Sequence, residues 1–231
     1  MRAIVRPLVA EFFGTFALIF VGAGSIIMEF RTNGGVGLVG IALAHGVVLS
    51  VWVTAGMRIS GAHYNPAITF ALWMSRHIDG KGALRYVGAQ LAGAVTAALV
   101  LSLLFPSAAT IAADLGVPRL ASGVDLTRGI LIEALLTFFL VSAMYGTVVS
   151  SEAPSVGGFG VGLALFFSIL AAGPLTGGAL NPARAFGPAL VAGAWHGHIA
   201  YWIGPALGAA VASLIWSKVL LPLPSARIGK T

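Results

Sequence analysis

Two identical tripeptides, Asn65-Pro66-Ala67 and Asn181-Pro182-Ala183, carry the polar groups with the clearest chemistry in this chain. At a helix N-cap, an Asn side chain binds backbone N–H groups that have no partner within the helix. Pro suits the next position, because the first helical residue needs no N–H partner. The surrounding segments, residues 60–71 and 176–187, align without a gap. Each tripeptide therefore predicts a short helix that begins out of a Gly-rich turn.

Ionisable side chains are rare in the apolar stretches of the chain. Arg184 follows the second tripeptide directly, and Glu11 and Glu133 occupy matching places in two apolar stretches. A charge inside a membrane faces a cavity or a partner, so each is a candidate functional group. We expect both carboxylates to be structural acceptors for the N–H groups of the two turns; a proton relay through them is the alternative.

The composition excludes most other classes of protein. Of the 231 residues, 58% are hydrophobic and 9% are charged, with a mean hydropathy of +0.97, whereas about 25% charge is typical of soluble domains. There is no cysteine, which excludes disulfides and thiolate metal sites. His196 and His198 are a weak metal signal, and we find no nucleophile–base pair. We therefore expect no enzyme activity, no cofactor and no metal.

Six apolar stretches are long enough to cross a bilayer, which takes about 20 helical residues. They are residues 7–28, 37–56, 84–105, 128–149, 158–173 and 199–221. The sequence thus predicts an all-α membrane protein with a single channel domain over residues 1–231.

Positive charge predicts the orientation of these spans. With six spans both termini share a side, and nine Lys and Arg residues lie there against four on the other side. The nine are Arg2, Arg6, Arg58, Arg76, Lys81, Arg85, Lys218, Arg227 and Lys230; the four are Arg31, Arg119, Arg128 and Arg184. By the positive-inside rule both termini are cytoplasmic. We expect a multi-pass protein of the plasma (inner) membrane, and the dispersed charges indicate no nucleic-acid partner.

The two halves of the chain resemble each other. Residues 10–16 parallel residues 132–138, and residues 86–94 parallel residues 201–209. The first repeat covers about residues 7–105 and the second about residues 128–221, with a loop at 106–127 between them. Because each repeat has three spans, the second enters the membrane from the opposite side. Such inverted repeats place a solute site near the midplane.

The two tripeptide segments predict re-entrant half-helices. About ten residues of helix span ~15 Å, half of the ~30 Å hydrocarbon core. Irregular backbone at that depth is tolerated where it lines a water-filled cavity. We therefore expect the turns to line a pore and to offer carbonyl oxygens to a solute file. The candidate lining residues are Gly61, Ala62, His63, Gly177 and Ala179.

Asn65 and Asn181 would form the central constriction of this pore. Two helix N-termini that meet there place about half a positive charge each at the midplane, which opposes cations. Amide donors from both side chains would hold one water by its oxygen and interrupt proton hopping. In the simpler interpretation the two residues only cap their helices, and the two roles are compatible.

These features resemble the aquaporin, or major intrinsic protein, family. The resemblance rests on the two Asn-Pro-Ala boxes, the Arg184 that follows the second, the paired Glu11 and Glu133, and the segment SGAHYNPA at residues 60–67. It covers the whole chain except the loop at 106–127. It implies six helices with two half-helices, usually assembled as a homotetramer with one pore per subunit.

The resemblance also implies an outer selectivity filter. By alignment its members are His45, Ile169, Gly178 and Arg184. Many water-only members have Phe in the second span and His in the fifth, so this filter should be wider. The His/Ile/Gly/Arg set resembles plant vacuolar-type channels that pass ammonia as well as water.

The implied function is a passive channel for water and small uncharged solutes that excludes protons and ions. Ala185, where glycerol-type members usually carry Asp, favours the water type. The wide filter keeps ammonia, hydrogen peroxide, glycerol and metalloid hydroxides such as arsenite as candidate solutes. The alternatives are an ion-coupled secondary transporter that uses Glu11 and Glu133, and a closed junctional or scaffold protein.

Overall fold

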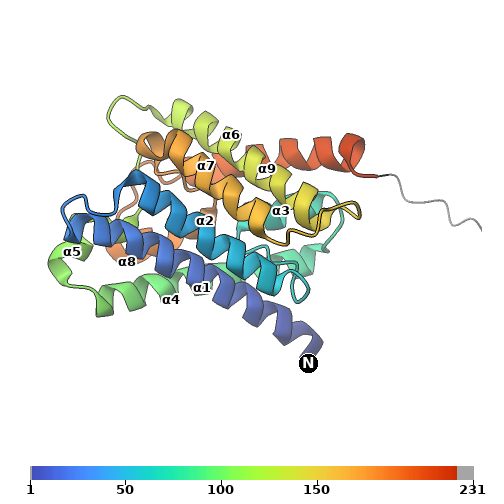
Figure 1. The fold of residues 1–231 in the computed structure, drawn as a ribbon, viewed down its shortest axis with the longest axis horizontal. Helices are drawn as coiled ribbons and strands as arrows, with labels where there is room; N and C mark the ends of the chain where they lie inside the picture. Colours follow the sequence, from blue (N-terminus) through green and yellow to red (C-terminus); the bar gives the residue numbers. More distant parts are fainter. Residues whose placement is uncertain (1, 223–231) are drawn as a thin grey trace, which may run out of the picture.

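Six long helices lie side by side in a bundle (Figure 1). The computed structural model describes residues 2–222, and within this range each of the six has the length and hydropathy of a membrane span. They are α1 (Arg2–Arg31), α2 (Gly37–Gly56), α4 (Gly80–Leu104), α6 (Leu126–Met144), α7 (Phe159–Thr176) and α9 (Ala200–Ile215). Single π-helical turns continue α6 as η2 (Tyr145–Val149) and α9 as η3 (Trp216–Leu220). The predicted all-helical, six-span fold is confirmed.

Three helices, α1, α4 and α6, begin before the predicted span, and α4 and α6 do so because each has a polar N-cap. Asp79 accepts a hydrogen bond from the backbone N–H of Gly82 at 2.7 Å and so starts α4 at Gly80. Asp125 accepts one from the N–H of Arg128 at 2.9 Å and starts α6 at Leu126. An apolar stretch marks the part of a helix that lies in lipid, whereas the caps mark where the backbone becomes helical.

Two short helices, α3 (Pro66–Met74) and α8 (Pro182–Ala192), complete the bundle. Each starts at the Pro of its tripeptide with the preceding Asn as the N-cap, as the sequence predicts. With 9 and 11 residues, each reaches about half way across a bilayer core. In Figure 1 they lie towards opposite ends of the bundle.

The helix contacts follow the inverted repeat. Helix α1 packs mainly on α4, α6 packs in the same way on α9, and α2 packs on α7. Each half-helix also contacts the last span of the other half: α3 packs on α9, and α8 packs on α4. Glycines at matching places allow the closest approaches: a Cβ atom on Gly93 would overlap the carbonyl of Phe12, and one on Gly208 that of Ala134.

The connection between the two repeats is folded. It contains α5 (Ser107–Ala112) and a tight turn, η1 (Asp114–Gly116), whose three residues all have left-handed backbone with φ of 42°, 54° and 76°. The central residue, Leu115, is buried, and η1 contacts both α1 and α8. Sequence reasoning offered nothing for this segment, because its order depends on helices that are distant in the chain.

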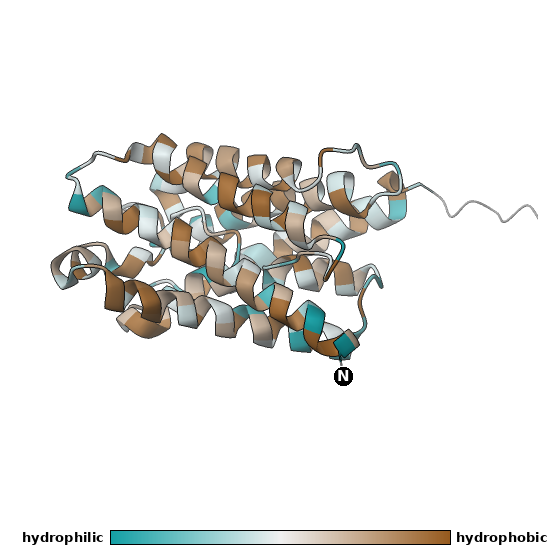
Figure 2. Ribbon diagram, turned by 60° about the horizontal axis from the view of Figure 1, so that its bottom comes forward, coloured by the Kyte–Doolittle hydropathy of each residue, from teal (hydrophilic) through white to brown (hydrophobic). Residues whose placement is uncertain are grey.

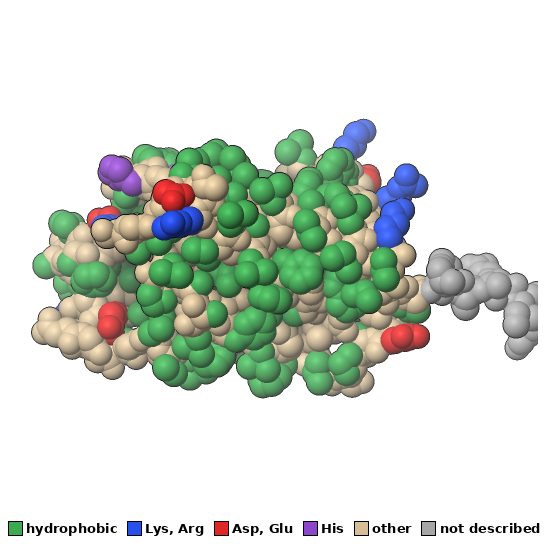
Figure 3. Space-filling model, turned by 90° about the horizontal axis from the view of Figure 1, so that it is seen from above, with side chains coloured by type: hydrophobic (Ala, Val, Ile, Leu, Met, Phe, Trp, Pro, Cys, Tyr) green, Lys and Arg blue, Asp and Glu red, His purple; other side chains and the backbone are tan. Residues whose placement is uncertain are grey.

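Apolar side chains cover the outside of the bundle. Figure 2 shows hydrophobic residues along the helices and hydrophilic ones mainly near their ends. Figure 3 shows a largely apolar face with most of its Lys and Arg side chains at one end and a further one beside an acidic side chain towards the other end. Large residues such as Leu103 (82% exposed) and Leu84 (75% exposed) suit contact with lipid. Below, the end where α1 begins is called the inner end and the opposite one the outer end. Arg227 and Lys230 lie outside the described residues.

Candidate functional site

The two Asn-Pro-Ala boxes are joined to each other by their asparagine side chains. Asn65 Oδ1 accepts from the N–H of Ala67 at 2.8 Å, and its Nδ2 donates to the carbonyl of Leu180 in the other half at 2.8 Å. Asn181 Oδ1 accepts from the N–H of Ala183 at 3.0 Å, and its Nδ2 donates to the carbonyl of Tyr64 at 2.9 Å. Each amide nitrogen carries two N–H groups. One N–H on each side therefore remains for another partner.

Four carbonyl oxygens of the two turns accept hydrogen bonds from side chains of the protein. The carbonyls of Tyr64 and Leu180 accept from the asparagines. Two further turn carbonyls, those of Ser60 and Thr176, accept from tyrosine hydroxyls of the last spans. The first two oxygens link the two halves, and the other two hold each turn to the last span of its own half. Buried carbonyls of irregular backbone need such partners. That other carbonyls of the turns serve a solute file stays a prediction.

Buried carboxylates hold both turns in shape. Glu11 accepts from the N–H groups of His63 (3.0 Å) and Tyr64 (2.7 Å), and also from the Ser60 hydroxyl (2.6 Å). Tyr64 has left-handed backbone with φ of 50°, which costs roughly 1–2 kcal/mol for a residue with a Cβ atom. Several hydrogen bonds to one carboxylate stabilise this conformation.

The second turn repeats the arrangement around Glu133. This carboxylate accepts from the N–H groups of Ala179 (3.0 Å) and Leu180 (2.7 Å) and from the Thr176 hydroxyl (2.7 Å). Leu180 matches Tyr64 in its left-handed backbone, with φ of 53°. Both carboxylates thus make contacts that suit a structural group.

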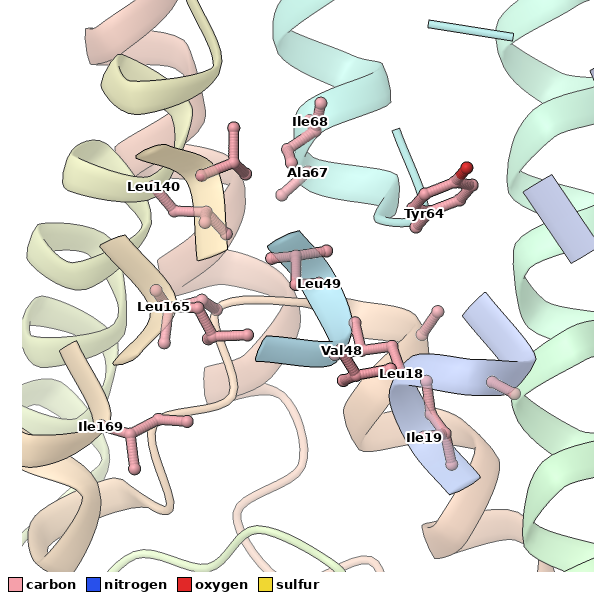
Figure 4. Close-up of a cluster of buried hydrophobic side chains, with 14 of the residues drawn as sticks. Leu18, Ile19, Val48, Leu49, Tyr64, Ala67, Ile68, Leu140, Leu165 and Ile169 are labelled. Atoms are coloured by element: carbon pink, nitrogen blue, oxygen red, sulfur yellow. The ribbon is translucent and has the colours of Figure 1, made fainter. Parts of the chain in front are cut away.

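A narrow cavity lies at the meeting point of the two half-helices. Its polar border consists of His45, His63, Asn65, Asn181 and Arg184, with Ala179 beside them. Its apolar border comes from five different helices, whose side chains are labelled in Figure 4: Leu18, Leu49, Ile68, Leu140 and Leu165. Polar groups along one line within an apolar wall bind a small polar solute weakly and let it move on.

His45 and Arg184 form the outer part of this cavity's polar border. His45 Nδ1 lies 2.8 Å from the carbonyl of Ile41, and since a carbonyl only accepts, Nδ1 carries a proton. Arg184 is 2% exposed, and its Nη1 donates to the carbonyl of Gly116 in η1 at 2.7 Å. Its Nε and Nη2 have no hydrogen-bond partner among the described residues. These unpaired donors are available to a solute oxygen.

Ile169 and Gly178, the other two predicted filter residues, lie beside each other. Ile169 and Arg184 both border an outer vestibule, together with Gly177 of the second turn. A Cβ atom on Gly178 would lie 3.2 Å from Ile169 Cγ1, so these two predicted filter residues touch. Arg184 borders the vestibule and the narrow cavity alike and is the common member of the predicted set.

The predicted lining residues of the first turn are distributed unevenly. His63 borders the narrow cavity. Gly61 lies beside it, since a Cβ atom there would be 3.2 Å from His63 Nε2. Ala62 is fully buried, and a role for it in lining the pore stays a prediction.

Sequence reasoning missed two buried polar side chains next to the cavity. Gln90 of α4 donates to Glu11 at 2.8 Å and to the Thr69 hydroxyl at 2.9 Å. Thr69, on α3, also lies 3.0 Å from the imidazole of His63. An uncharged polar residue in the middle of an apolar span was the available signal for Gln90, because such residues are usually bonded inside the bundle.

Of the two histidines in the outer loop, His198 packs among aromatic side chains. His198 Nε2 accepts from Trp202 Nε1 at 3.0 Å, and its ring packs edge-on against Trp195 at a centroid distance of 4.8 Å. Partial burial lowers the pKa of the His198 imidazole from its usual range. Within residues 2–222, no three or more His, Cys, Asp or Glu side chains lie together in a way that could hold a metal ion.

Comparisons with known proteins agree with this geometry. Residues 2–216 match the family described as Major intrinsic protein. The chain is 43% identical to "Aquaporin TIP4-4" of Zea mays, with 95% of this chain and 91% of that protein covered. It is 39% identical to "Probable aquaporin TIP3-2" of Arabidopsis thaliana, with 94% and 85% covered.

A solved structure agrees over the same length. The aquaglyceroporin from Plasmodium falciparum superimposes with a TM-score of 0.80 at 25% identity, and the match covers 94% of this chain and 97% of that one. The family match, the relatives and the paired half-helices lead to one conclusion. The chain belongs to the major intrinsic protein family and is an aquaporin-type membrane water channel, not an enzyme.

Proposed function

We propose that this channel passes small uncharged solutes in addition to water and excludes protons and ions. Asn65 and Asn181 would form its centre, and His45, Ile169, Gly178 and Arg184 its filter. The proposal rests mainly on the burial and the unpaired nitrogens of Arg184. This guanidinium is buried at the border of both cavities with two nitrogens unpaired, so it can donate to a passing oxygen.

The same arrangement supports the exclusion of cations. The fixed charge of Arg184 repels them at the outer part of the cavity. Further in, the N-termini of α3 and α8 meet at the two asparagines, each with about half a positive charge. A neutral solute pays neither electrostatic cost.

The breadth of the solute range rests on the two filter residues without polar side chains. Gly178 adds no side chain, and Ile169 offers an apolar surface to the vestibule. Ammonia, hydrogen peroxide, glycerol and metalloid hydroxides such as arsenite are the solutes that such an opening would admit. Among these we favour ammonia, because it is the smallest and can donate to His45.

Stopped-flow measurements on proteoliposomes test this range with water, ammonia, glycerol and arsenous acid in parallel. We expect His45→Phe combined with Gly178→Thr to lower ammonia and glycerol flux about tenfold relative to water, the size of effect expected when a pocket loses space for one or two heavy atoms. Val47→Phe with Gly88→Thr is the matched control. Val47 is exposed on the same helix, and a Cβ atom on Gly88 meets no neighbour. An unchanged flux ratio in the double variant would contradict the assigned filter.

The assembly and orientation are also proposals. We propose a homotetramer with one pore per subunit, for which the broad apolar surface leaves room (Figure 3), and cytoplasmic termini at the Lys- and Arg-rich inner end. The plasma membrane expected from the sequence finds no support among the plant relatives, which are tonoplast intrinsic proteins. These relatives favour a vacuolar-type channel over a channel of the plasma membrane.

The surroundings of the two buried carboxylates do not favour an ion-coupled transporter. Glu11 and Glu133 are each held by three or more donors, and neither is among the residues bordering the narrow cavity. A closed scaffold would show no permeability above that of bare lipid in the same measurements.

A further inference from the structure

A line of hydrogen bonds joins a buried carboxylate to the narrow cavity. It runs from Glu11 through Gln90 and Thr69 to His63. Building on the channel function above, we propose that Gln90 and Thr69 are positioning residues for His63. They hold its ring proton on Nδ1, so that Nε2 offers a hydrogen-bond acceptor to solutes with N–H or O–H groups at the inner end of the cavity.

The carboxylate of Glu11 fixes the orientation of the Gln90 amide. Gln90 Nε2 lies 2.8 Å from Glu11 Oε2 and 2.9 Å from Thr69 Oγ1. A rotated amide would turn its oxygen towards the carboxylate, and two acceptors would then face each other. With the nitrogen in place, one N–H binds Glu11 and the other must bind Thr69. The Thr69 hydroxyl is therefore an acceptor for Gln90.

The remaining contacts of Thr69 decide the protonation of His63. Thr69 Oγ1 lies 3.1 Å from the carbonyl of Asn65 and 3.0 Å from His63 Nδ1. A hydroxyl has one proton and two lone pairs. Since the Asn65 carbonyl can only accept, it takes the hydroxyl proton. The second lone pair of Thr69 then accepts from Nδ1–H, and all three contacts are satisfied.

The reverse arrangement makes one hydrogen bond fewer. If the Thr69 proton went to His63 Nδ1, the hydroxyl would lose its bond to the Asn65 carbonyl, and His63 Nε2 would carry the ring proton. Burial makes such a loss costly, and His63, Thr69 and Gln90 are all buried. In the favoured arrangement Nε2 keeps its lone pair, and it has no partner among the described residues.

The second half of the channel has no equivalent of this line. By the alignment of the two repeats, the counterparts of His63, Thr69 and Gln90 are Ala179, Ala185 and Pro205. Three polar residues in contact are thus replaced together by three residues without polar side chains. The line is consequently a feature of the inner end alone and does not belong to the duplicated scaffold.

The outer end obtains its acceptor by another route. His45 Nδ1 donates to the carbonyl of Ile41, so a neutral His45 also has a free Nε2. Two imidazole acceptors then flank the amide donors of Asn65 and Asn181 along the cavity. A water that accepts from the amides points its hydrogens away from the centre, towards an acceptor on either side. This pattern supports opposite water orientations in the two halves of the file.

The tautomer of His63 is measurable by nitrogen NMR of protein with ¹⁵N-labelled histidine in lipid bilayers. The chain has five histidines, and His63→Gln identifies the signal. We expect neutral His63 with the proton on Nδ1. In Thr69→Val the ratio of the Nδ1–H to the Nε2–H form should fall about fivefold, as the loss of one hydrogen bond implies, and Thr69→Ser should restore it.

The control is Thr137→Val, which removes another fully buried hydroxyl that has no hydrogen-bond partner in the described structure. It should leave the His63 signal unchanged. A wild-type His63 protonated on Nε2, or an unchanged ratio in Thr69→Val, would overturn the proposal. If Thr69→Val does not fold, the wild-type spectrum still decides. Because the tautomer is read without transport, a channel that fails to conduct the proposed solutes would leave this result intact.

Discussion

The two Asn-Pro-Ala turns share a backbone and differ in what it presents to the cavity. In both turns a buried Glu accepts two backbone N–H groups and one hydroxyl, and a Tyr of the last span of the same half donates to a turn carbonyl. The left-handed residues also coincide, with φ of 86° and 85° at Gly61 and Gly177 and of 50° and 53° at Tyr64 and Leu180.

The functional side chains break this symmetry. Where the second half has Arg184, the first has Ile68. Where the first half has the line from Gln90 to His63, the second has no polar side chain. Helix pairs and caps are therefore duplicated, whereas each end of the cavity has its own polar group. Under the proposed function, the repeated elements therefore form the walls of the pore, and the side chains that differ between the halves determine which solute passes.

The scaffold should fail in the same way in either half, and this is the largest effect we predict. Glu11→Leu and Glu133→Leu each leave at least three donors without their acceptor. Buried donors left unpaired cost ~1–3 kcal/mol each, so each variant should lose ~3 kcal/mol or more. We expect both to yield little folded protein by size-exclusion chromatography in detergent.

Conservative variants sharpen that comparison. Glu11→Gln and Glu133→Gln keep one acceptor oxygen, so we expect each to fold with reduced thermal stability. Water permeability that remains intact in one Glu→Leu variant only would show that the two turns are not supported equivalently.

Substitution of a proposed filter residue should change the selectivity, whereas substitution of its counterpart in the other half should not. Arg184→Val removes a charge and two unpaired donors from the cavity border, and hydrogen bonds to charged groups are worth ~1.5–3 kcal/mol each. We expect water flow to persist, while proton or cation leakage rises at least about tenfold in voltage-clamped or pH-sensitive vesicles. Ile68→Val, at the matching place in the first half, should leave selectivity unchanged. Equal leakage from both variants would contradict the division of roles.

The asparagines should again be equivalent, with a smaller cost. Asn65→Ala and Asn181→Ala each remove a helix cap, worth ~1 kcal/mol and up to about 2, and one bond to the other half. We expect both to lower the stability by about 2 kcal/mol, measured by thermal or denaturant unfolding in detergent. The double variant should cost less than the sum, because the pair is coupled through adjacent turns. A difference of more than about 1 kcal/mol between the single variants would break the symmetry.

The parts of this molecule that sequence reasoning recovers are local in origin. A cap such as Asn65 or Asn181 acts on N–H groups two or three residues away, so the residues themselves predict the start of α3 and α8. Apolar spans are equally local, because lipid imposes the composition of each helix separately. Comparing the halves then supplies the inverted repeat, and with it the meeting of the two helix ends.

The parts that it misses depend on contacts between distant segments. Arg184 donates a hydrogen bond to the carbonyl of Gly116, which is 68 residues away in the sequence. Gly116 belongs to a turn with left-handed backbone, and no sequence motif predicts this turn. The partners of His63 are Thr69, six residues on, and through it Gln90 on another helix. The sequence therefore predicts which side chains form the filter, but it does not predict the hydrogen-bond partners that orient these side chains.

The smallest effect we predict concerns the turn that orients Arg184. Residues 114–116 belong to neither repeat, and Asp114 forms an ion pair with Arg119 across the end of this turn. Both side chains are partly exposed, at 34% and 58%, and such pairs contribute ~0–1 kcal/mol. Asp114→Asn should therefore leave folding intact and change the ammonia-to-water flux ratio less than twofold, with the change diminished in high salt.

Gly116→Ala provides the contrast, because its φ of 76° and the Ala23 Cβ atom 2.7 Å from an added methyl group both resist a side chain. We expect this variant to displace the carbonyl that binds Arg184 and to shift the flux ratio several-fold, towards the behaviour of Arg184→Val. If Asp114→Asn alone reproduced Arg184→Val, the ion pair would be what holds the outer filter. The inner end would then differ from the outer one in a second respect, since His63 depends on buried partners of its own half, whereas Arg184 would depend on an exposed pair between the halves.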